Sequence, residues 1–467
     1  MREVNKTPKT LVIDNQNPED NAMLQALYSR SNASVTDHLD KVQATGSGKF
    51  MESFYVGYGH RSIGDCGSTT IFIEGVSNVL AKAIQDNSLY SGQESSTRYL
   101  DYSQQAIVDP YNMDMTTRLI EGWLEIYLKY QPMVEAGLRI MFPKQENEKE
   151  TVWAKAIKAR SFDIMRGFLP VGVTTQLSWH TNLRQARDKL QQIAFHPVEE
   201  VREVARAIHA QLSAEYPNSF KDSDMIADGN EVNKWLSSPE LQEFHYSMLG
   251  GHFLNYKANE LRFECNTEYS LEGDDCEEFI NVLRTRPPHA PVPKAFDFGD
   301  NFLCAFVIDF GSFRDIQRHR NGLCPIPIVN DCGYGINHWY INSAVEALTA
   351  GAGDEVATDF KNEVTLQLEN VNELRELDAF AQHYDIHKHQ YLYPLGLDLD
   401  CAVQYSFSQM IYVSELRSTQ YVHPTLRPIA QAMGEVIERV APGIALHVDY
   451  DPDKWSIARG NQDITEK

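Results

Sequence analysis

The hydrophobic and polar positions of the chain predict the same short succession of elements twice. From Thr69 to Ser88 the pattern reads as an apolar strand, a turn that contains glycine, and a helix with apolar residues three and four apart. From Phe302 to Arg320 the same order returns. One such match can arise by chance, so a second pair is needed to interpret it.

A second pair of matching segments follows further along the chain. Phe168 to Leu190 and Leu392 to Arg417 each carry an apolar residue, Pro, another apolar residue and Gly, followed by an amphipathic helix. The offset between them is 392 − 168 = 224 residues. Each is followed by a His-Pro step, at His196 and His423, where the proline suits a helix start. Two pairs in the same order indicate an internal duplication.

The polar, acidic stretch from Tyr216 to Ser238 is the predicted boundary between the two copies. We therefore predict two domains, residues 1–225 and residues 235–467. A length of 467 residues is sufficient for two domains with substantial cores.

Composition limits the kinds of partner that the chain is expected to bind. With 42 Lys and Arg against 65 Asp and Glu, the net charge is −23, which argues against nucleic acid and anionic membranes as partners. A small anion is still possible where a few arginines gather. Seven cysteines without a CxxC pair favour a reducing compartment, and no apolar run is long enough for a membrane span. A cytoplasmic protein is the expectation.

The residues that carry chemistry are divided between the two copies. Residues 86–99 read DNSLYSGQESSTRY, whereas residues 318–331 read RHRNGLCPIPIVND. Together they resemble the signature RHRxxSxNExSxRY of the flavin-dependent thymidylate synthases. The first copy keeps Ser91, Glu94, Ser96, Arg98 and Tyr99 but has Asp86, Asn87 and Ser88 in place of RHR; the second keeps only Arg318, His319 and Arg320.

Other positions of the family pattern are divided in the same way. The arginine before the Leu-Pro step is Arg166 in the first copy and is replaced by Gln390 in the second. The arginine that ends the following helix falls on Ile193 in the first copy and on Arg417 in the second. The first copy alone keeps an NxR pair and a Gly-His-x-Ser pattern, at Asn182, Arg184, Gly59, His60 and Ser62.

The resemblance implies an α/β (α+β) fold in each half, with long helices against a small sheet. It also implies one composite nucleotide site per chain, to which each half supplies what the other has lost. Two chains would form a homodimer that resembles the family's tetramer. Substrate binding is then expected from Glu94, Ser96, Arg98, Arg166, Arg318 and Arg417, of which Arg318 and Arg417 are also the catalytic candidates. Cofactor binding is expected from His60, Ser62, Asn182, Arg184, Arg318, His319 and Arg320.

The implied activity is C5 methylation of dUMP with FAD, methylenetetrahydrofolate and NADPH. Guanidinium groups bind a nucleotide phosphate bidentately, and Arg417 is placed to stabilise charge that develops on the uracil ring. Departures such as Gln93 for Asn and Asp65 for Glu keep two alternatives open. These are a flavoenzyme for another pyrimidine nucleotide and a nucleotide- or flavin-binding protein without synthase activity.

Two further groups of residues receive structural interpretations. Among His383, His387 and His389, the pair four residues apart has a spacing that suits a metal. No further ligand is evident to complete such a site, so an exposed helix without metal is predicted. Cys324, Cys332 and Cys401 are predicted to be structural, because the flavin-dependent synthases use no cysteine nucleophile.

Overall fold

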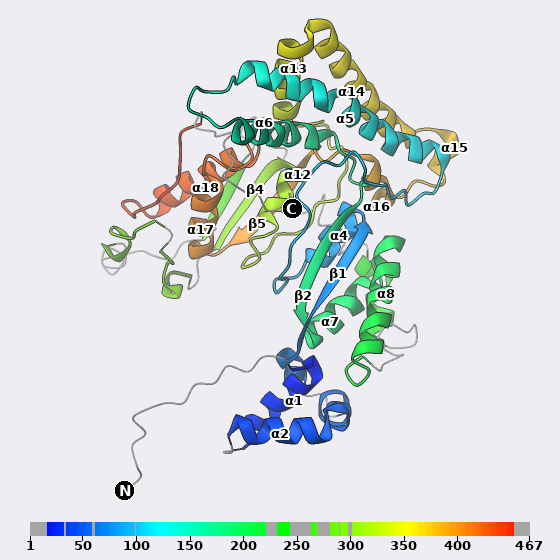
Figure 1. Cartoon of the computed structure of the whole chain (residues 1–467), viewed down its shortest axis with the longest axis vertical. Coiled ribbons are helices and arrows are strands. Elements are labelled where there is room, and N and C mark those ends of the chain that lie inside the picture. The colour runs from blue at the N-terminus through cyan, green and yellow to red at the C-terminus, as the bar shows by residue number, and fades with distance from the viewer. Residues whose placement is uncertain are drawn as a thin grey trace. The chain divides into compact units, whose positions relative to one another are not determined.

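The computed structural model describes residues 16–31, 34–57, 61–98, 100–220, 231–242, 263–268, 281–288, 290–297 and 301–452 (Figure 1). The chain divides into two compact units. Unit 1 consists of Met1–Phe72, Ser178–His196 and Val201–Ser237, and unit 2 of Ile73–Leu177, Pro197–Glu200 and Ser238–Lys467. Unit 2 therefore draws on both of the domains that the sequence predicts.

Unit 1 is mostly helical. A small core of Met23, Leu24 and Val42 packs α1 against α2. Asn17 begins α1 by accepting a hydrogen bond from the amide of Glu19, at 2.9 Å. The helices of this unit are α1 (Pro18–Tyr28), α2 (Val35–Thr45), α3 (Gly48–Phe50), η1 (Met51–Gly57), η2 (Arg61–Cys66), α7 (Leu183–Ile193), most of α8 (Glu199–Glu215) and α9 (Glu231–Leu236).

Two strands carry the chain across the boundary between the units. β1 (Ser68–Val76) and β2 (Thr175–Asn182) pair in a two-stranded sheet. β2 alternates buried and more exposed positions along its length, as a strand with one covered face does.

Unit 2 contains a three-stranded antiparallel sheet in the order β3-β4-β5. Its strands are β3 (Phe263–Glu268), β4 (Asn301–Asp309) and β5 (Asp398–Tyr405). In the β4–β5 pair Phe302 lies opposite Tyr405 and Asp309 opposite Asp398. The last four residues of β4 are all buried, because helices pack beside the sheet at that end. Those helices are α12 (Phe310–Ile316), α17 (Phe407–Arg417) and α18 (Arg427–Val440).

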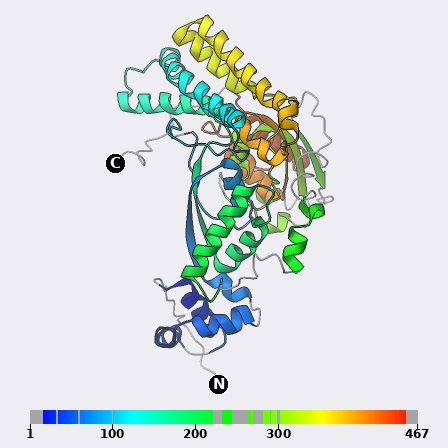
Figure 2. The same ribbon diagram turned by 90° about the vertical axis from the view of Figure 1, so that its right-hand side faces the viewer.

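Long helices form the other part of unit 2. In Figures 1 and 2, α5 and α13 lie side by side, and α14 packs against both. Gly137 of α5 allows the close approach, since a Cβ there would lie 1.7 Å from the carbonyl oxygen of Ala347. The longer helices are α5 (Asp114–Met141), α6 (Glu150–Met165), α13 (His338–Ala352) and α14 (Asp354–Leu374). The short ones are α4 (Asn78–Gln85), η3 (Arg166–Phe168), α10 (Pro239–Gln242), η6 (Lys294–Asp297), α15 (Asp378–Ala381), α16 (Ile386–His389) and η7 (Gln390–Leu392).

Four junctions from strand to helix share one device. Ser77, Asn182, Asp309 and Ser406 each accept a hydrogen bond from a backbone amide in the first turn of the helix that follows. Such caps satisfy amides that a helix start leaves without a partner. The order strand, cap and helix is therefore the same at the two predicted pairs of segments.

Backbone bonds within unit 2 join the Leu169-Pro170 step and the Tyr393-Pro394 step reciprocally. The amide of Val171 donates to the carbonyl of Tyr393, and the amide of Leu395 donates to the carbonyl of Leu169, both at 2.8 Å. Val171 is equivalent to Leu395 and Leu169 to Tyr393 at the predicted offset, since 395 − 171 = 224 and 393 − 169 = 224, so the two bonds exchange equivalent positions. Contacts in which i meets j and j meets i have the form that a two-fold axis produces.

The mixture of long helices and small sheets agrees with the predicted α+β fold class. The predicted exposed helix at His383–His389 is partly wrong. His389 is 1% exposed, and its Nε2 lies 3.1 Å from the carbonyl oxygen of Val371 at the end of α14. Burial lowers the pKa of His389 to about 4, so its imidazole is neutral at pH 7. Among the described residues, no helix is both long and apolar enough to cross a membrane.

Candidate functional site

The RHR segment begins just beyond the end of α12, in unit 2. Asp309 caps this helix through the amide of Ser312, at 2.9 Å. A Cβ on Gly311 would lie 3.0 Å from the capping oxygen Asp309 Oδ1, and the next residue, Ser312, accepts from Arg166 Nη2 at 2.7 Å. The sequence DFGS thus sets the helix against a residue of the first half, and Arg318 follows two residues after Ile316 ends the helix.

Arginines from both halves of the chain act on one carboxylate, that of Asp315. Burial would raise the pKa of Asp315, but the charges of Arg318, Arg417, Arg98 and Arg166 hold it well below its usual value. Arg318 Nη1 lies 3.4 Å from Asp315 Oδ1, and Arg417 Nη2 donates to the Asp315 carbonyl at 3.0 Å. The predicted substrate arginines of the two halves therefore gather within one chain.

Arg417 and His319 form a direct pair at this cluster. Arg417 Nε donates to His319 Nε2 at 2.8 Å, and the His319 side chain is buried beside Tyr412. Burial and the charge of Arg417 lower the pKa of His319 to about 3. The ring is therefore a neutral acceptor that positions Arg417. Half of the Arg318 side chain is exposed, which leaves that guanidinium accessible from solvent.

Glu94 lies at the centre of a buried charged triad. Its Oε1 accepts from Arg314 Nη2 at 2.5 Å, and its Oε2 accepts from Lys82 Nζ and Gln85 Nε2, both at 2.8 Å. Burial would raise the pKa of Glu94, but Arg314 and Lys82 lower it to about 2. Both carboxylate oxygens are thus bound by side chains of the chain itself, so Glu94 holds its loop against α12.

Arg98 is held by a buried acid, and Arg166 is held by two buried hydroxyl groups. Arg98 binds Asp163 through two nitrogens, at 2.7 and 3.3 Å, and the Ser96 hydroxyl accepts from the Arg98 amide at 3.3 Å. Arg166 is 1% exposed; it donates to Ser312 Oγ at 2.7 Å and to Tyr340 OH at 3.1 Å. In this structure Arg166 is enclosed by protein, so its predicted contact with phosphate stays a prediction.

Arg320 turns towards the first half of the chain. Its guanidinium lies 4.6 Å from the centroid of the Tyr90 ring, and its Nε donates to the Gln85 carbonyl at 3.4 Å. Burial lowers the pKa of Arg320. This cation–π contact places the third residue of RHR beside the loop that carries Ser91 and Glu94.

The remaining predicted cofactor residues belong to unit 1. Arg184 Nε pairs with Asp65 Oδ1 at 2.7 Å, and each side chain is about a third exposed. Asn182 uses its side-chain oxygen to cap α7, at 2.8 Å from the Gln185 amide. Ser62 is exposed. His60 lies outside the described residues.

Sequence reasoning missed three charged residues that organise this cluster. Asp315 precedes Arg318 by three residues, a spacing at which opposite charges pair on a helix. Lys82 and Arg314 are cations separated by 314 − 82 = 232 residues, the offset at which Asp86 corresponds to Arg318, since 318 − 86 = 232. The one sign of the triad in the sequence was therefore that both copies have a cation at this position.

Comparison with known proteins gives this arrangement a family context. Residues 10–218 match the sequence model of the family described as thymidylate synthase complementing protein. A UPF0159 protein of Chlamydia pneumoniae is 22% identical, over 90% of this chain and 83% of its own length. A UPF0159 protein of Thermoplasma acidophilum is 21% identical, over 91% of this chain and 94% of its own length.

The first half of the chain is thus similar, over residues 10–218, to the thymidylate synthase complementing protein family. The likeness to the UPF0159 proteins covers about nine tenths of the chain, so it extends well beyond residue 218 into the half that carries RHR.

Proposed function

We propose that the chain is a flavin-dependent thymidylate synthase-like enzyme built from two copies of one domain, with one composite nucleotide site. The observation that supports this most is that Asp315, which contacts Arg318 and Arg417 of the second half, also has its pKa lowered by the charges of Arg98 and Arg166 of the first half. Each half has kept the arginines that the other lacks. The reciprocal backbone bonds between the Leu169-Pro170 and Tyr393-Pro394 steps support the duplication.

The charge balance of this cluster suits a nucleotide phosphate. Arg98 is paired with Asp163, and Arg166 is near Asp309, whereas Arg318 and Arg417 share the single carboxylate of Asp315. The cluster thus contains more guanidinium groups than carboxylates, although the chain as a whole has a net charge of −23. Arg318, the most exposed of the four, is the group that meets the anion first.

In the proposed reaction dUMP is methylated at C5, with methylenetetrahydrofolate and NADPH as co-substrates. Arg417, fixed by His319, stabilises negative charge on the uracil ring, and Arg318 binds the phosphate. FAD, once reduced, supplies the hydride. Arg184 and Ser62 are among the residues expected to hold FAD. A guanidinium and a hydroxyl can donate hydrogen bonds to the anionic phosphates of FAD, and both side chains are at least partly exposed.

A second candidate function is binding of a nucleotide or flavin without synthase activity. A related candidate is a flavoenzyme that acts on another pyrimidine nucleotide. The engagement of both Glu94 oxygens by Lys82, Gln85 and Arg314 favours it, since a residue expected to bind substrate is occupied. Turnover separates the candidates. Tritium release from 5-³H-dUMP in the presence of FAD, folate and NADPH supports the synthase, whereas nucleotide binding without release supports the second candidate.

Calorimetric titration with dUMP tests the composite site. Arg318→Ala and Arg417→Ala are each expected to weaken binding by roughly tenfold to a hundredfold, because a charge-assisted hydrogen bond contributes about 1.5–3 kcal/mol. Arg375→Ala removes a half-exposed arginine on the same unit and serves as the matched control. Unchanged affinity in either site variant would contradict the shared site.

A further inference from the structure

One tyrosine at the arginine cluster is exposed, although its neighbours on the same helix are buried. Tyr412 of α17 has 55% of its surface exposed, whereas Ile411 and Val413 on either side of it are 1% and 0% exposed. The Tyr412 ring meets the His319 ring edge to face, with 5.8 Å between the centroids and 74° between the planes. Such a contact covers at most one face of a ring, so the imidazole leaves the other face of Tyr412 uncovered.

Two cations of the cluster lie close to this ring. His319, which Tyr412 contacts, accepts a hydrogen bond from Arg417 Nε at 2.8 Å, and Arg318 is the residue before His319 in the chain. Burial lowers the pKa of Arg417; the charge of Arg318 adds to this effect and Tyr412 opposes it. Tyr412 and Arg318 therefore both lie within electrostatic reach of one guanidinium. An exposed aromatic ring and a half-exposed cation thus share this part of unit 2.

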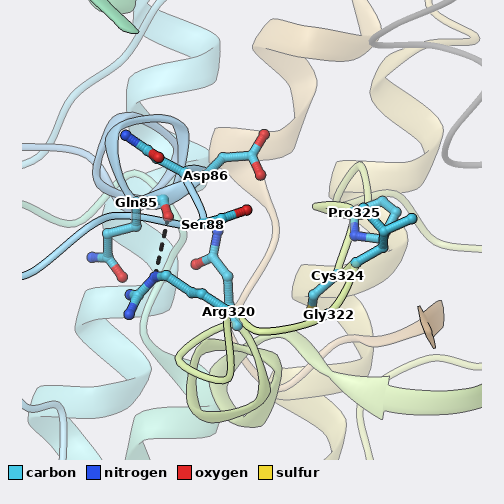
Figure 3. Close-up of a pocket in the computed structure, with 10 residues that line it drawn as sticks. Gln85, Asp86, Ser88, Arg320, Gly322, Cys324 and Pro325 are labelled. Carbon is cyan, nitrogen blue, oxygen red and sulfur yellow. Dashed lines mark hydrogen bonds between the residues drawn. The ribbon is translucent and has the colours of Figure 1, made fainter. Parts of the chain in front are cut away.

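The third residue of RHR is directed elsewhere. Figure 3 shows Arg320 beside Gln85 and Ser88, where its Nε donates to the Gln85 carbonyl at 3.4 Å. The same guanidinium lies 4.6 Å from the centroid of the Tyr90 ring. Arg320 therefore has its aromatic partner in the first half, and the ring on α17 is left to the other arginines of the cluster.

The first copy has neither the ring nor the arginine at the equivalent place. Tyr412 corresponds to Asp188, since 412 − 188 = 224, and Arg417 corresponds to Ile193, since 417 − 193 = 224. The copy that has the arginine at the end of this helix is thus also the copy that has the tyrosine. This coincidence is expected if the two side chains serve one ligand.

A tyrosine in unit 1 makes the same kind of contact without an arginine. Tyr28 is 54% exposed and meets the buried His38 edge to face, with 6.4 Å between the centroids and 83° between the planes. His38 Nε2 has no hydrogen-bond partner among the described residues, whereas His319 Nε2 is bound by Arg417. The Tyr–His contact by itself is therefore a packing feature, and the guanidinium is what distinguishes the pair on α17.

We propose that Tyr412 is a further binding residue of the composite site, on whose ring the pyrimidine of the nucleotide stacks while the phosphate binds Arg318. This inference rests on the proposed function, because it concerns the base of that same nucleotide. Stacking on an aromatic side chain suits any planar base, since every base has a π-face. Tyr412 therefore raises the affinity for the ring, and Arg318 raises the affinity for the anion attached to it.

The nucleotide dUMP and 2-deoxyribose 5-phosphate are matched probes, because they share a sugar and a phosphate and differ in the ring. Calorimetric titration of the full chain with dUMP is expected to give a Kd about fivefold to a hundredfold higher for Tyr412→Leu than for the wild type, the effect of losing one base–aromatic contact. Tyr412→Phe keeps the ring and is expected to bind dUMP as the wild type does. Both variants are expected to bind the ring-free probe as the wild type does.

Ligand-observed NMR separates stacking from an indirect effect through His319. The H5 and H6 protons of bound dUMP are expected to move upfield in the wild type and in Tyr412→Phe, because the face of an aromatic ring shields protons above it. This shift is expected to be lost in Tyr412→Leu. Tyr28→Leu makes the same change at an equally exposed tyrosine that also meets a histidine, and it is expected to change neither the Kd nor the shift.

The possible contrary results have different consequences. Equal losses of both probes in Tyr412→Leu, or no loss of either, would overturn the role of Tyr412 and leave the nucleotide site in place. Weaker FAD binding with unchanged dUMP binding in this variant would also overturn it, because the ring would then serve the cofactor. A wild type that binds neither probe would overturn the proposed nucleotide site itself, and the role of Tyr412 with it.

Discussion

Two loops occupy equivalent places in the two halves but carry opposite charges. One follows α4 and spans residues 86–98, and the other follows α12 and spans residues 318–330. The first brings an acid, Glu94, whose two oxygens are bound by cations from both halves. The second brings cations, Arg318 and Arg320, and has Ile326 where the acid would be. The first loop therefore has a buried charge network, whereas Gln317 Oε1, directly before the second loop, is buried without a hydrogen-bond partner among the described residues.

The difference shows that one acid organises both halves of the chain. Lys82 and Arg314 occupy equivalent positions, yet both bind Glu94: Lys82 pairs with it inside the first half, and Arg314 reaches it from the second half. Burial lowers the pKa of Lys82 to about 8, although Glu94 acts to raise it. One carboxylate therefore neutralises two cations in the triad, and removing it would leave both cations buried without a counter-charge.

Glu94→Gln is expected to have the largest effect on stability. Breaking a buried ion pair by removing one partner costs about 3–5 kcal/mol, since the remaining charges are left uncompensated. Both Lys82 and Arg314 are buried, so solvent cannot replace the lost carboxylate. The free energy of unfolding, measured with urea, gives the cost directly.

The matched control for this variant is Glu363→Gln, which breaks the pair between Glu363 and Lys129 on the surface of unit 2. An exposed pair contributes about 0–1 kcal/mol. Equal effects of the two substitutions would mean that the triad does not join the halves. A similar loss in Lys82→Met would also contradict the argument, because that change removes the excess cation and leaves Glu94 with Arg314.

The pH dependence of stability tests the His319–Arg417 pair. The pKa of His319 is about 3 in the folded chain, against 6.5 for an ordinary histidine. Between these values the unfolded chain binds a proton that the folded chain does not, so stability falls as the pH falls below 6.5. In His319→Gln this contribution disappears. The wild type is therefore expected to lose up to about 1.4 kcal/mol more per pH unit than the variant in this window.

Unfolding curves of the two proteins at pH 8 and between pH 6.5 and 4.5 make the measurement. The difference at pH 8 reports the loss of packing and of the hydrogen bond, since neither state of His319 is charged there. Only the change of that difference with pH reports titration. Parallel curves would show that the imidazole is not held neutral by burial and Arg417.

Much of this arrangement could be predicted from sequence because it depends on motifs and local pattern. The paired strand–helix segments follow from the hydrophobic pattern, whereas the α+β class and the four arginines follow from the resemblance of the motifs to those of the flavin-dependent thymidylate synthases. The organising acid of the cluster could not be predicted in the same way. Asp315 belongs to no signature position; Arg318 and Arg417 contact it, and the charges of Arg98 and Arg166 also lower its pKa.

Burial is the other property that the sequence did not reveal. Arg166 fits the expected motif, but whether its guanidinium faces a ligand or Ser312 and Tyr340 depends on how α12 and α13 pack. The burial of His389 depends likewise on α14, because its ring lies against the carbonyl of Val371, 18 residues earlier in the chain. Side-chain environments set by distant elements leave no periodic signal in the chain.

The smallest expected effect on stability belongs to Asn182→Ser, which gives the first copy the residue that Ser406 provides in the second. Both side chains cap a helix by accepting from the amide three residues on. Asn and Ser are nearly equivalent caps, so the free energy of unfolding is expected to change by only a few tenths of a kcal/mol, whereas Asn182→Ala costs about 1 kcal/mol. Flavin titration of the same variants separates capping from cofactor binding. Weaker FAD binding in Asn182→Ser at unchanged stability supports the cofactor role, and equal FAD binding means that the residue is a cap alone.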